Sequence, residues 1–550
     1  MQIFFNAEII TSLSPLSTAS AVVVDQGRIL STGDQEEVLS RYDESIPRTD
    51  LGGRMVIPGL IDAHIHLQNY ALSLLRVNCE TASKGDCLEN VAIQAEKTPI
   101  GDWILGHGWN QNQWSEGFGS AQDLDRITAQ HPIYLTAKSL HAAWVNSAAL
   151  QQAQLTAQTP DPPGGRIQRD PDGNPTGILL ETAMSLVSDI IPQPAPDSVA
   201  EAICEAQPKL WAMGLTGVHD FDRRTCFIAL QKLHAEAKLK LRVTKSIPIE
   251  SLSSAVDLGL QTGFGDDMLR IGSLKAFADG ALGPRTAAML QPYENEPDNR
   301  GLLMLDAETI FELGQVAVSN GLSMAIHAIG DSANHEVLNA YEQLRRYEHQ
   351  ISPRSIREAK FTKLRHRIEH VQIIHPDDLS RLASLQVIAS MQPIHAPSDS
   401  TVADRYWGDR ARNAYAWRSL SEAGTQFAFG SDAPVESPNP FWGIHAAVTR
   451  KRHDAPPETQ AWYPEQRISL TKALQGFTAG AAFAAGMEDR LGKLAPGYMA
   501  DFLVLDNDIF SVNQDEILHI RPMGTMIAGD WVYLTPTLAE LISSDEHPLP

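Results

Sequence analysis

The chain has 550 residues, 43% of them hydrophobic and 20% charged, which is enough apolar material for a large core and excludes a disordered protein. Its 44 Lys and Arg against 67 Asp and Glu give a formal net charge of −23, a sign that repels nucleic-acid phosphates. No stretch reaches the ~18–20 apolar residues that span a bilayer, and the N-terminus lacks the pattern of a secretory signal. Four cysteines form neither a disulfide framework nor a CxxC site, so we expect a cytoplasmic protein without a nucleic-acid or membrane partner.

Short strands are predicted at both ends of the chain. Residues 21–33, AVVVDQGRILSTG, have the pattern of a β-hairpin with Gln26 and Gly27 at the bend. Near the other end, ADFLVLD (500–506) and TMIAGDWVYL (525–534) are similar short strands. We expect residues 1–54 and 489–550 to form one composite domain, a small β-sandwich.

The middle of the chain, residues 55–488, alternates apolar segments with helical stretches. Near-continuous apolar runs are typical of strands that are buried on both faces of a parallel sheet. Eight such segments, each ending in polar residues, lie at 55–67, 216–221, 241–247, 269–280, 322–331, 366–374, 387–395 and 425–435. This count predicts an α/β fold of the TIM-like (β/α)8 barrel type. An open doubly wound sheet is the alternative, but no G-x-G-x-x-G follows the first strand.

One interval does not fit the alternation. About 140 residues separate the first segment from the second, far more than a βα unit needs. WILGHGW (103–109) and PIYLTAK (132–138) within it are strand-like. We expect an inserted cap subdomain at residues 68–210, after the first barrel strand.

The strongest local signal is His64-Ile65-His66, at the polar end of the first segment. Residues i and i+2 of a strand point to the same side, so both imidazoles can reach one metal ion. An HxH pair alone is weak evidence, and two unrelated histidines are the ordinary alternative. The position at the end of a buried strand favours the metal interpretation.

Other strand ends add candidates of the same chemistry. His327, His370 and Asp432 end the fifth, sixth and eighth segments. Singly, each has an ordinary explanation, such as a helix cap for Gly430-Ser431-Asp432. Together, several histidines and a carboxylate suit zinc, iron or manganese, and Asp432 could also accept the proton of an attacking water.

Lys275 lies inside the apolar segment IGSLKAFA, where an unpaired charge is costly. A salt bridge to Asp279 or another acidic neighbour is one interpretation. The other is an uncharged amine that reacts with carbon dioxide, giving a carbamate whose two oxygens bridge two metal ions.

These motifs resemble a known family. PGLIDAHIHL, the mid-chain lysine, HAIGD, RIEH, GSDAPV and GKLAPGYMADFLVLD are similar to the amidohydrolase superfamily of metal-dependent hydrolases. SLKAFADGALGPRTA, HAIGDSANHEVLNAYE, HRIEHVQI and SMQPIHA resemble its amidohydrolase-3 branch, the YtcJ-like and N-substituted formamide deformylase-like proteins. The resemblance covers nearly the whole chain, in order.

The resemblance implies a role for each matching residue. The implied metal ligands are His64, His66, Lys275, His327, His370 and Asp432, and Asp432 also matches the general base. It implies a divalent metal, zinc first, as one or two ions that a carboxylated Lys275 could bridge.

Further residues are candidates for substrate contact, each with an ordinary alternative. His395 could polarise the substrate carbonyl or be a core histidine, and Arg285 could bind an anionic group or pair with an acidic neighbour. Trp109, Trp114 and His141 could line the pocket, although tryptophans at such places often only pack. Glu369 is interpreted as structural because it points away from the side of His370, and His219 receives no role.

We therefore expect hydrolysis of a carbon–nitrogen bond in a small molecule, such as an N-formyl or N-acyl amine. A cyclic-amide hydrolase, a heterocycle deaminase, and a lactone or phosphoester hydrolase are rivals, because metal-activated water serves all of them. A catalytically silent scaffold on the same barrel predicts broken ligand positions, and all six are intact. The oligomeric state stays open, with a homodimer as one expectation.

Overall fold

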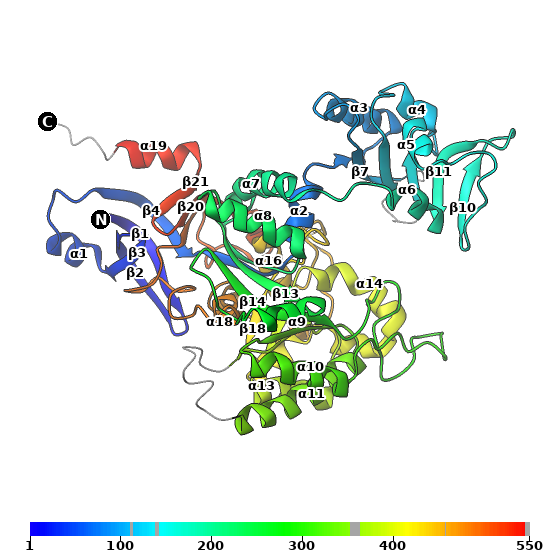
Figure 1. The fold of residues 1–550 in the computed structure, drawn as a ribbon. Coiled ribbons are helices and arrows are strands. Elements are labelled where there is room, and N and C mark those ends of the chain that lie inside the picture. The colour runs from blue at the N-terminus through cyan, green and yellow to red at the C-terminus, as the bar shows by residue number, and fades with distance from the viewer. Residues whose placement is uncertain (111–113, 138–141, 352–363, 457, 545–550) are drawn as a thin grey trace. The chain divides into compact units, whose positions relative to one another are not determined.

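The computed structural model describes residues 1–110, 114–137, 142–351, 364–456 and 458–544. The chain divides into two compact units, one made of Met1–Tyr70 and Val199–Pro550 and the other of Ala71–Ser198 (Figure 1). The second unit lies within the interval 68–210, where the sequence predicts an insertion.

The first unit contains an eight-stranded parallel sheet whose strands are neighbours in chain order. Each strand overlaps one of the eight segments expected from the sequence. They are β5 (Leu60–Ile65), β12 (Leu215–Asp220), β13 (Arg242–Pro248), β14 (Leu269–Phe277), β15 (Met324–Ala328), β16 (Arg367–His370), β17 (Ile388–Met391) and β18 (Phe427–Phe429). The strands β12 and β13 extend one residue beyond their segments. Three residues after Phe429, the backbone N–H of Asp432 donates to the carbonyl of His64 at 2.7 Å. The segment that follows β18 therefore lies against β5 and closes the sheet. The (β/α)8 barrel is thereby confirmed.

Helices alternate with these strands, as the pattern predicts. They are α2 (Leu67–Ser73), α7 (Pro196–Ala212), α8 (Arg224–Ala235), α9 (Leu252–Asp257), α10 (Ala307–Ser319), α11 (Asp331–Gln350), α13 (Leu379–Leu385), α14 (His395–Trp407), α15 (Trp417–Glu422), α16 (Pro440–Thr449), α17 (Leu470–Phe477) and α18 (Ala479–Ala484). All residues of β5 and β12 are buried, as expected of strands that are covered on both faces of a parallel sheet. Ile61 and Ala63 of β5 pack with Ala481 and Ala482 of α18 in one core cluster.

Strands from both chain ends form a second sheet in the same unit, with the order β21-β20-β19-β4-β1-β2-β3. They are β1 (Gln2–Leu13), β2 (Leu16–Asp25), β3 (Arg28–Gly33), β4 (Arg48–Pro58), β19 (Phe502–Leu505), β20 (Pro522–Ile527) and β21 (Asp530–Leu534). Helices α1 (Gln35–Arg41) and α19 (Pro536–Ser544) accompany them. The expected hairpin is confirmed: β2 pairs with β3 in antiparallel fashion, and Gln26 and Gly27 have φ of 48° and 77°, the left-handed values that its tight turn requires. Phe4, Phe502 and Trp531 pack edge to face across this sheet.

A buried ion pair joins the terminal sheet to the barrel. Arg242 of β13 donates to both carboxylate oxygens of Asp501, from Nε at 2.6 Å and from Nη2 at 2.8 Å. Asp501 immediately precedes β19, and its backbone carbonyl accepts from Gly59 N–H at 2.9 Å.

The unit Ala71–Ser198 is built on a six-stranded sheet of order β10-β11-β9-β8-β7-β6. Its strands are β6 (Val77–Asn78), β7 (Ile104–Trp109), β8 (Ile133–Ala137), β9 (Ala142–Val145), β10 (Gly165–Arg169) and β11 (Pro175–Glu181). Its helices are α3 (Lys84–Ala95), α4 (Ala121–Asp125), α5 (Ser147–Gln152) and α6 (Ser185–Ser188). The strand-like segments predicted at 103–109 and 132–138 correspond to β7 and β8.

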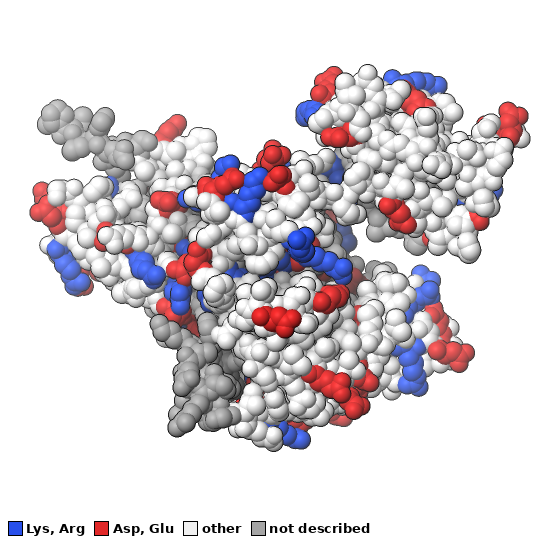
Figure 2. All heavy atoms as spheres, viewed as in Figure 1, with Lys and Arg blue, Asp and Glu red and all other residues white. Residues whose placement is uncertain are grey.

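Acidic and basic side chains are interspersed on the face shown in Figure 2, so the excess of acid is not gathered in one patch there. In the part of the chain that the structure describes, no helix combines the length and the apolar character needed to cross a membrane.

Candidate metal centre

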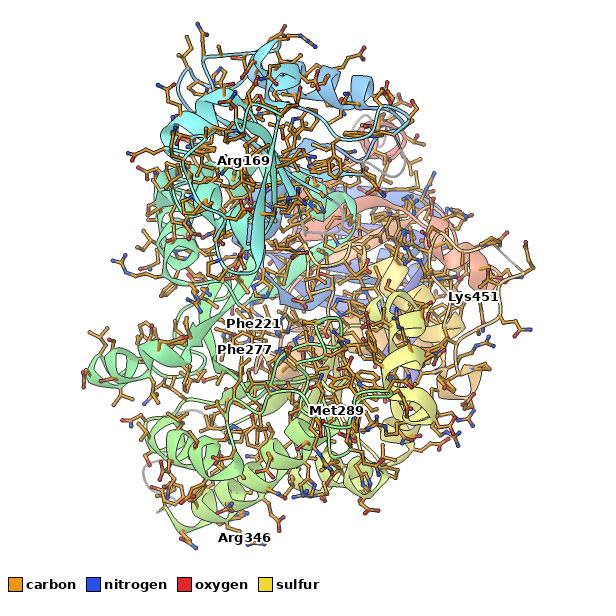
Figure 3. The ribbon with its side chains drawn as sticks, turned by 90° about the vertical axis from the view of Figure 1, so that its right-hand side faces the viewer. Arg169, Phe221, Phe277, Met289, Arg346 and Lys451 are labelled. Carbon is orange, nitrogen blue, oxygen red and sulfur yellow. The ribbon has the colours of Figure 1, made fainter. Side chains whose placement is uncertain are left out.

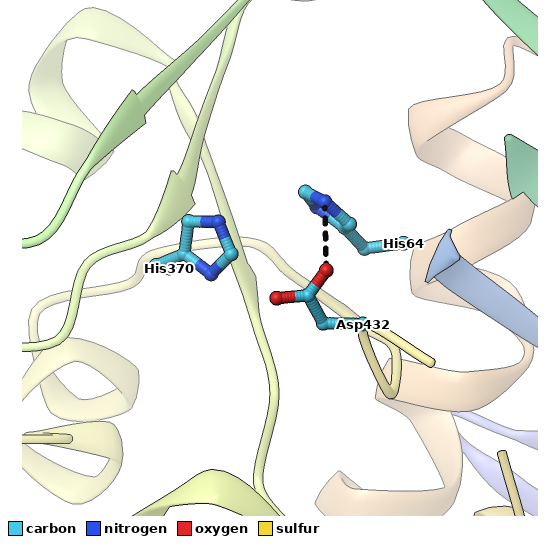
Figure 4. A group of neighbouring side chains, drawn as sticks. All are labelled: His64, His370 and Asp432. Carbon is cyan, nitrogen blue, oxygen red and sulfur yellow. Dashed lines mark ion pairs between the residues drawn. The ribbon is translucent and has the colours of Figure 1, made fainter. Parts of the chain in front are cut away.

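The carboxyl ends of the barrel strands bring the predicted ligands together. His64 is in β5, His327 is in β15 and His370 ends β16, whereas Asp432 follows β18 by three residues. The ligand atoms of His64, His370 and Asp432 all lie within 4.8 Å of one another, and all three residues are buried (Figure 4). The ring centres of His327 and His370 are 4.6 Å apart. The structure therefore places these four strand ends around one point.

Asp432 is the centre of the group. Its Oδ1 atom lies 3.5 Å from Nε2 of His64 and 3.4 Å from Nε2 of His66. Burial acts to raise the pKa of Asp432, but the two histidines outweigh it and hold that pKa well below its usual range. The carboxylate is therefore ionised and can serve as a ligand or as a base.

The local backbone that positions Asp432 is unusual. Asp432 has φ of 61°, a left-handed conformation that Asp tolerates better than most residues. The preceding Ser431 donates from Oγ to the carboxylate of Asp62 at 2.5 Å, and its N–H donates to the same carboxylate at 3.0 Å. These bonds fix the segment after β18 against β5.

Gly430 permits this close approach, and a Gly430→Ala variant tests it. A Cβ atom there would lie 2.4 Å from the backbone nitrogen of His64 and 2.6 Å from Oδ1 of Asp62. We expect the variant to lose about 1–3 kcal/mol of stability and to bind divalent metal more weakly, because β5 must move away from Asp432. Urea unfolding and metal titration measure the two effects. The control is Gly283→Ala, whose Cβ would meet no atom within 4 Å; equal losses in both variants would contradict the prediction.

Hydrogen bonds fix the tautomer of each candidate histidine. In every ring one nitrogen faces an oxygen atom of the protein: His64 Nδ1 with Glu369 Oε2 (2.6 Å), His66 Nδ1 with Asp222 Oδ1 (3.2 Å), His370 Nδ1 with Gln392 Oε1 (2.8 Å) and His327 Nε2 with the carbonyl of Gly280 (2.9 Å). Because these oxygens accept hydrogen bonds, the facing nitrogen carries the proton. In His64, His327 and His370 the other nitrogen keeps its lone pair, as metal ligation requires.

The charge states agree with this arrangement for three of the four rings. Burial lowers the pKa of His64 to about 4 and that of His327 to about 3, and it also lowers the pKa of His370. His66 differs, because its hydrogen bonds to Asp222 and Asp432 outweigh burial and raise its pKa to about 10. A cation held by His66 therefore takes the place of a proton.

Lys275 is a buried amine without a hydrogen-bond partner among the described residues. Its Nζ atom lies 4.7 Å from the ring centre of Phe221 and 4.9 Å from that of Phe277, two rings that are neighbours in Figure 3. Burial lowers the pKa of this amine to about 8. Asp279 is not the acidic partner of Lys275, because the Asp279 carboxylate accepts the backbone N–H groups of residues 288, 329 and 330. The acidic neighbours that act on this amine are Glu369 and Asp432, whose charges raise its pKa against the effect of burial.

Glu369 is the residue that sequence reasoning missed. Alternation along a strand predicts that the Glu369 side chain points away from the side of His370, which favours a structural role. The alternation ends at His370, which has φ of 76°, so both side chains reach the centre. The signal was present in HRIEH: Arg367 and Glu369 are opposite charges at i and i+2 of a buried strand, which predicts an internal ion pair. His219, left without a role, contacts Arg367 through Nδ1 at 2.9 Å.

The remaining candidates lie in different surroundings. His395 begins α14 and is buried, with Nε2 3.2 Å from the carbonyl of Ser431. Arg285 pairs with Glu296 and lies 5.3 Å from the ring of Tyr406.

The tryptophan candidates belong to the core of the unit Ala71–Ser198. The indole N–H groups of Trp109 and Trp114 donate to backbone carbonyls of residues 135 and 81, and their rings are stacked 6.3 Å apart. The third candidate in this unit, His141, lies outside the described residues. Substrate contact by these residues stays a prediction.

Comparisons with known proteins show what this chain is similar to. A model of the Amidohydrolase family, its amidohydrolase-3 branch, matches residues 49–533. The protein LONG AFTER FAR-RED 3 of Arabidopsis thaliana is 34% identical over 96% of this chain and 91% of its own length. The N-substituted formamide deformylase of Arthrobacter pascens is 28% identical over 95% of this chain and 96% of its own. The crystal structure of an uncharacterized metal-dependent hydrolase from Pyrococcus furiosus superposes with a TM-score of 0.76 at 30% identity, over 92% of this chain and 99% of that one.

Proposed function

The chain belongs to the amidohydrolase family of metal-dependent hydrolases acting on carbon–nitrogen bonds, and on that premise we propose that it hydrolyses the amide of an N-acyl or N-formyl amine. The similarity to an N-substituted formamide deformylase along almost the whole chain supports this substrate class. The single observation that carries the proposal is the position of Asp432 Oδ1, within 3.5 Å of Nε2 of both His64 and His66.

The donor set fits a divalent cation. Three imidazole rings, those of His64, His327 and His370, offer a free lone pair, and a cation would displace the proton of the fourth, His66. With the ionised carboxylate of Asp432 they form a set of nitrogen and oxygen donors, which suits zinc first. His64, His66, His327, His370 and Asp432 would hold the metal. When bound, such an ion lowers the pKa of water towards neutrality and polarises a carbonyl.

We extend the proposal to Lys275, whose amine has no hydrogen-bond partner among the described residues and is not one of the metal donors named above. Addition of its nitrogen to carbon dioxide forms one N–C bond, releases one proton and gives a carbamate with two oxygens. Those oxygens would supply ligands for a second ion.

The residues of the chain would handle the protons. Asp432 accepts a proton from the attacking water as the new C–O bond forms. It then passes that proton to the leaving nitrogen as the C–N bond breaks, so an acid and an amine are released. His395, buried beside Ser431, would contact the carbonyl oxygen, where negative charge develops.

A substrate screen on protein of known metal content tests the proposal. We expect turnover of N-formyl or N-acyl amines that is lost after chelation and restored by zinc. Cyclic amides, aminated heterocycles, lactones and phosphoesters form the comparison set, since metal-activated water can attack each of them. Activity confined to lactones or phosphoesters would overturn the amide assignment, and activity that survives complete metal removal would overturn the metal centre.

A further inference from the structure

We propose that Glu369 is a positioning residue of the metal centre, which holds the imidazole of His64 so that Nε2 faces Asp432. This inference rests on the proposed function for its metal but concerns a residue to which neither the family resemblance nor the donor set assigns a role. Glu369 Oε2 lies 2.6 Å from Nδ1 of His64, and the two side chains are 0% and 1% exposed.

Two contacts together leave the ring of His64 little freedom. The bond to Glu369 fixes its rotation in the plane of the ring. The ring of Phe221 is stacked on it, with centres 4.0 Å apart and planes 22° from parallel, which fixes its tilt. Because Nδ1 must donate to Glu369, the lone pair is at Nε2, 3.5 Å from Asp432 Oδ1.

Arg367 supplies the positive charge that allows the carboxylate of Glu369 to be buried. Its Nη2 atom donates to Oε2 of Glu369 at 2.9 Å, and its Nε atom donates to Oε1. The same Nη2 atom also bonds the carbonyl of Ala63 at 2.7 Å and the hydroxyl of Ser390, and Nη1 donates to His219 Nδ1 at 2.9 Å. These partners belong to β5, β17 and β12, so Arg367 is held from three other strands while it pairs with Glu369.

Stability alone explains this ion pair poorly. A buried ion pair can often be replaced by apolar residues without loss of stability, since its desolvation offsets its attraction. A comparable pair, Arg242 and Asp501, joins the barrel to the terminal sheet and is also buried and bidentate. The acceptor Asp501 contacts no candidate ligand, whereas Glu369 contacts His64. A comparison of the two ion pairs therefore distinguishes a structural role from a positioning role.

Three double variants test the proposal. Arg367→Leu/Glu369→Leu removes the pair together with the acceptor for His64, and Arg367→Leu/Glu369→Gln removes the charges but keeps an acceptor oxygen. Arg242→Leu/Asp501→Leu is the matched control. Zinc affinity by chelator competition and the thermal midpoint of the metal-free protein are measured for each.

We expect the Leu/Leu variant at 367 and 369 to bind zinc about 10–100-fold more weakly, the Leu/Gln variant to recover most of that loss, and the 242/501 control to keep wild-type affinity. Unchanged affinity in the Leu/Leu variant, or equal weakening in the Leu/Leu and Leu/Gln variants, would overturn the proposal.

NMR of the histidine ring nitrogens in the metal-free wild type tests the role of Glu369 independently. This measurement requires neither a folded variant nor a bound metal. A proton on Nδ1 of His64 supports the inference, and a proton on Nε2 overturns it. If the wild type binds no divalent metal at all, the proposed function fails, and the tautomer of His64 still decides the role of Glu369.

Discussion

The Asp432→Asn variant is expected to lose about 10²–10⁴-fold in kcat while it stays folded. Asparagine has nearly the same size and also tolerates the φ of 61° found at this position. It lacks the negative charge that accepts a proton and that pairs with the protonated His66, whose Nε2 atom lies 3.4 Å from Oδ1. Steady-state kinetics on the substrate found by screening, with the metal content of each preparation, measure the effect.

Asp306→Asn is a suitable control for this variant. Asp306 caps α10 through a bond to Thr309 N–H at 2.9 Å, and asparagine caps a helix about as well as aspartate. The control removes one negative charge without touching the centre and should keep wild-type kcat. A metal-loaded Asp432→Asn protein with wild-type kcat would refute Asp432 as the base.

Local sequence patterns predict much of the site. Side chains at i and i+2 of a strand share a face, so the spacing of His64 and His66 predicts that they lie together without any knowledge of the other strands. The structure directs both Nε2 atoms to one oxygen of Asp432. A parallel barrel has the carboxyl ends of all its strands at one face, which predicts that the candidate ligands surround one centre.

The hydrogen-bond partners of the ligands could not be found in the same way. Asp222 and Gln392 lie just after β12 and β17 and contact His66 and His370, which are 156 and 22 residues away. Such pairs depend on the register between strands and on turns beyond their ends, which a single sequence does not specify. Asp279 shows the same limit: its carboxylate accepts the backbone N–H groups of Ala288 and Gly330, 9 and 51 residues further along the chain, and does not pair with Lys275.

The Lys275→Met variant is expected to lose detectable turnover without losing stability. The Nζ atom of Lys275 is buried and has no hydrogen-bond partner among the described residues, so its burial opposes folding. Methionine fills a similar volume without a polar atom and should leave the metal-free protein as stable as the wild type, or about 1–3 kcal/mol more stable. Loss of activity with a gain of stability is typical of a residue kept for function.

A second buried lysine provides the matched control. Lys245 is 2% exposed, pairs with Asp220 at 2.9 Å and donates to the carbonyl of Ser246 at 3.1 Å. Lys245→Met leaves the carboxylate of Asp220 buried without its counter-charge and is expected to cost about 3–5 kcal/mol. Urea unfolding of the metal-free proteins compares the two variants directly. If Lys275→Met destabilises the fold as much as Lys245→Met does, Lys275 is a structural residue, and the proposed carbamate loses its support.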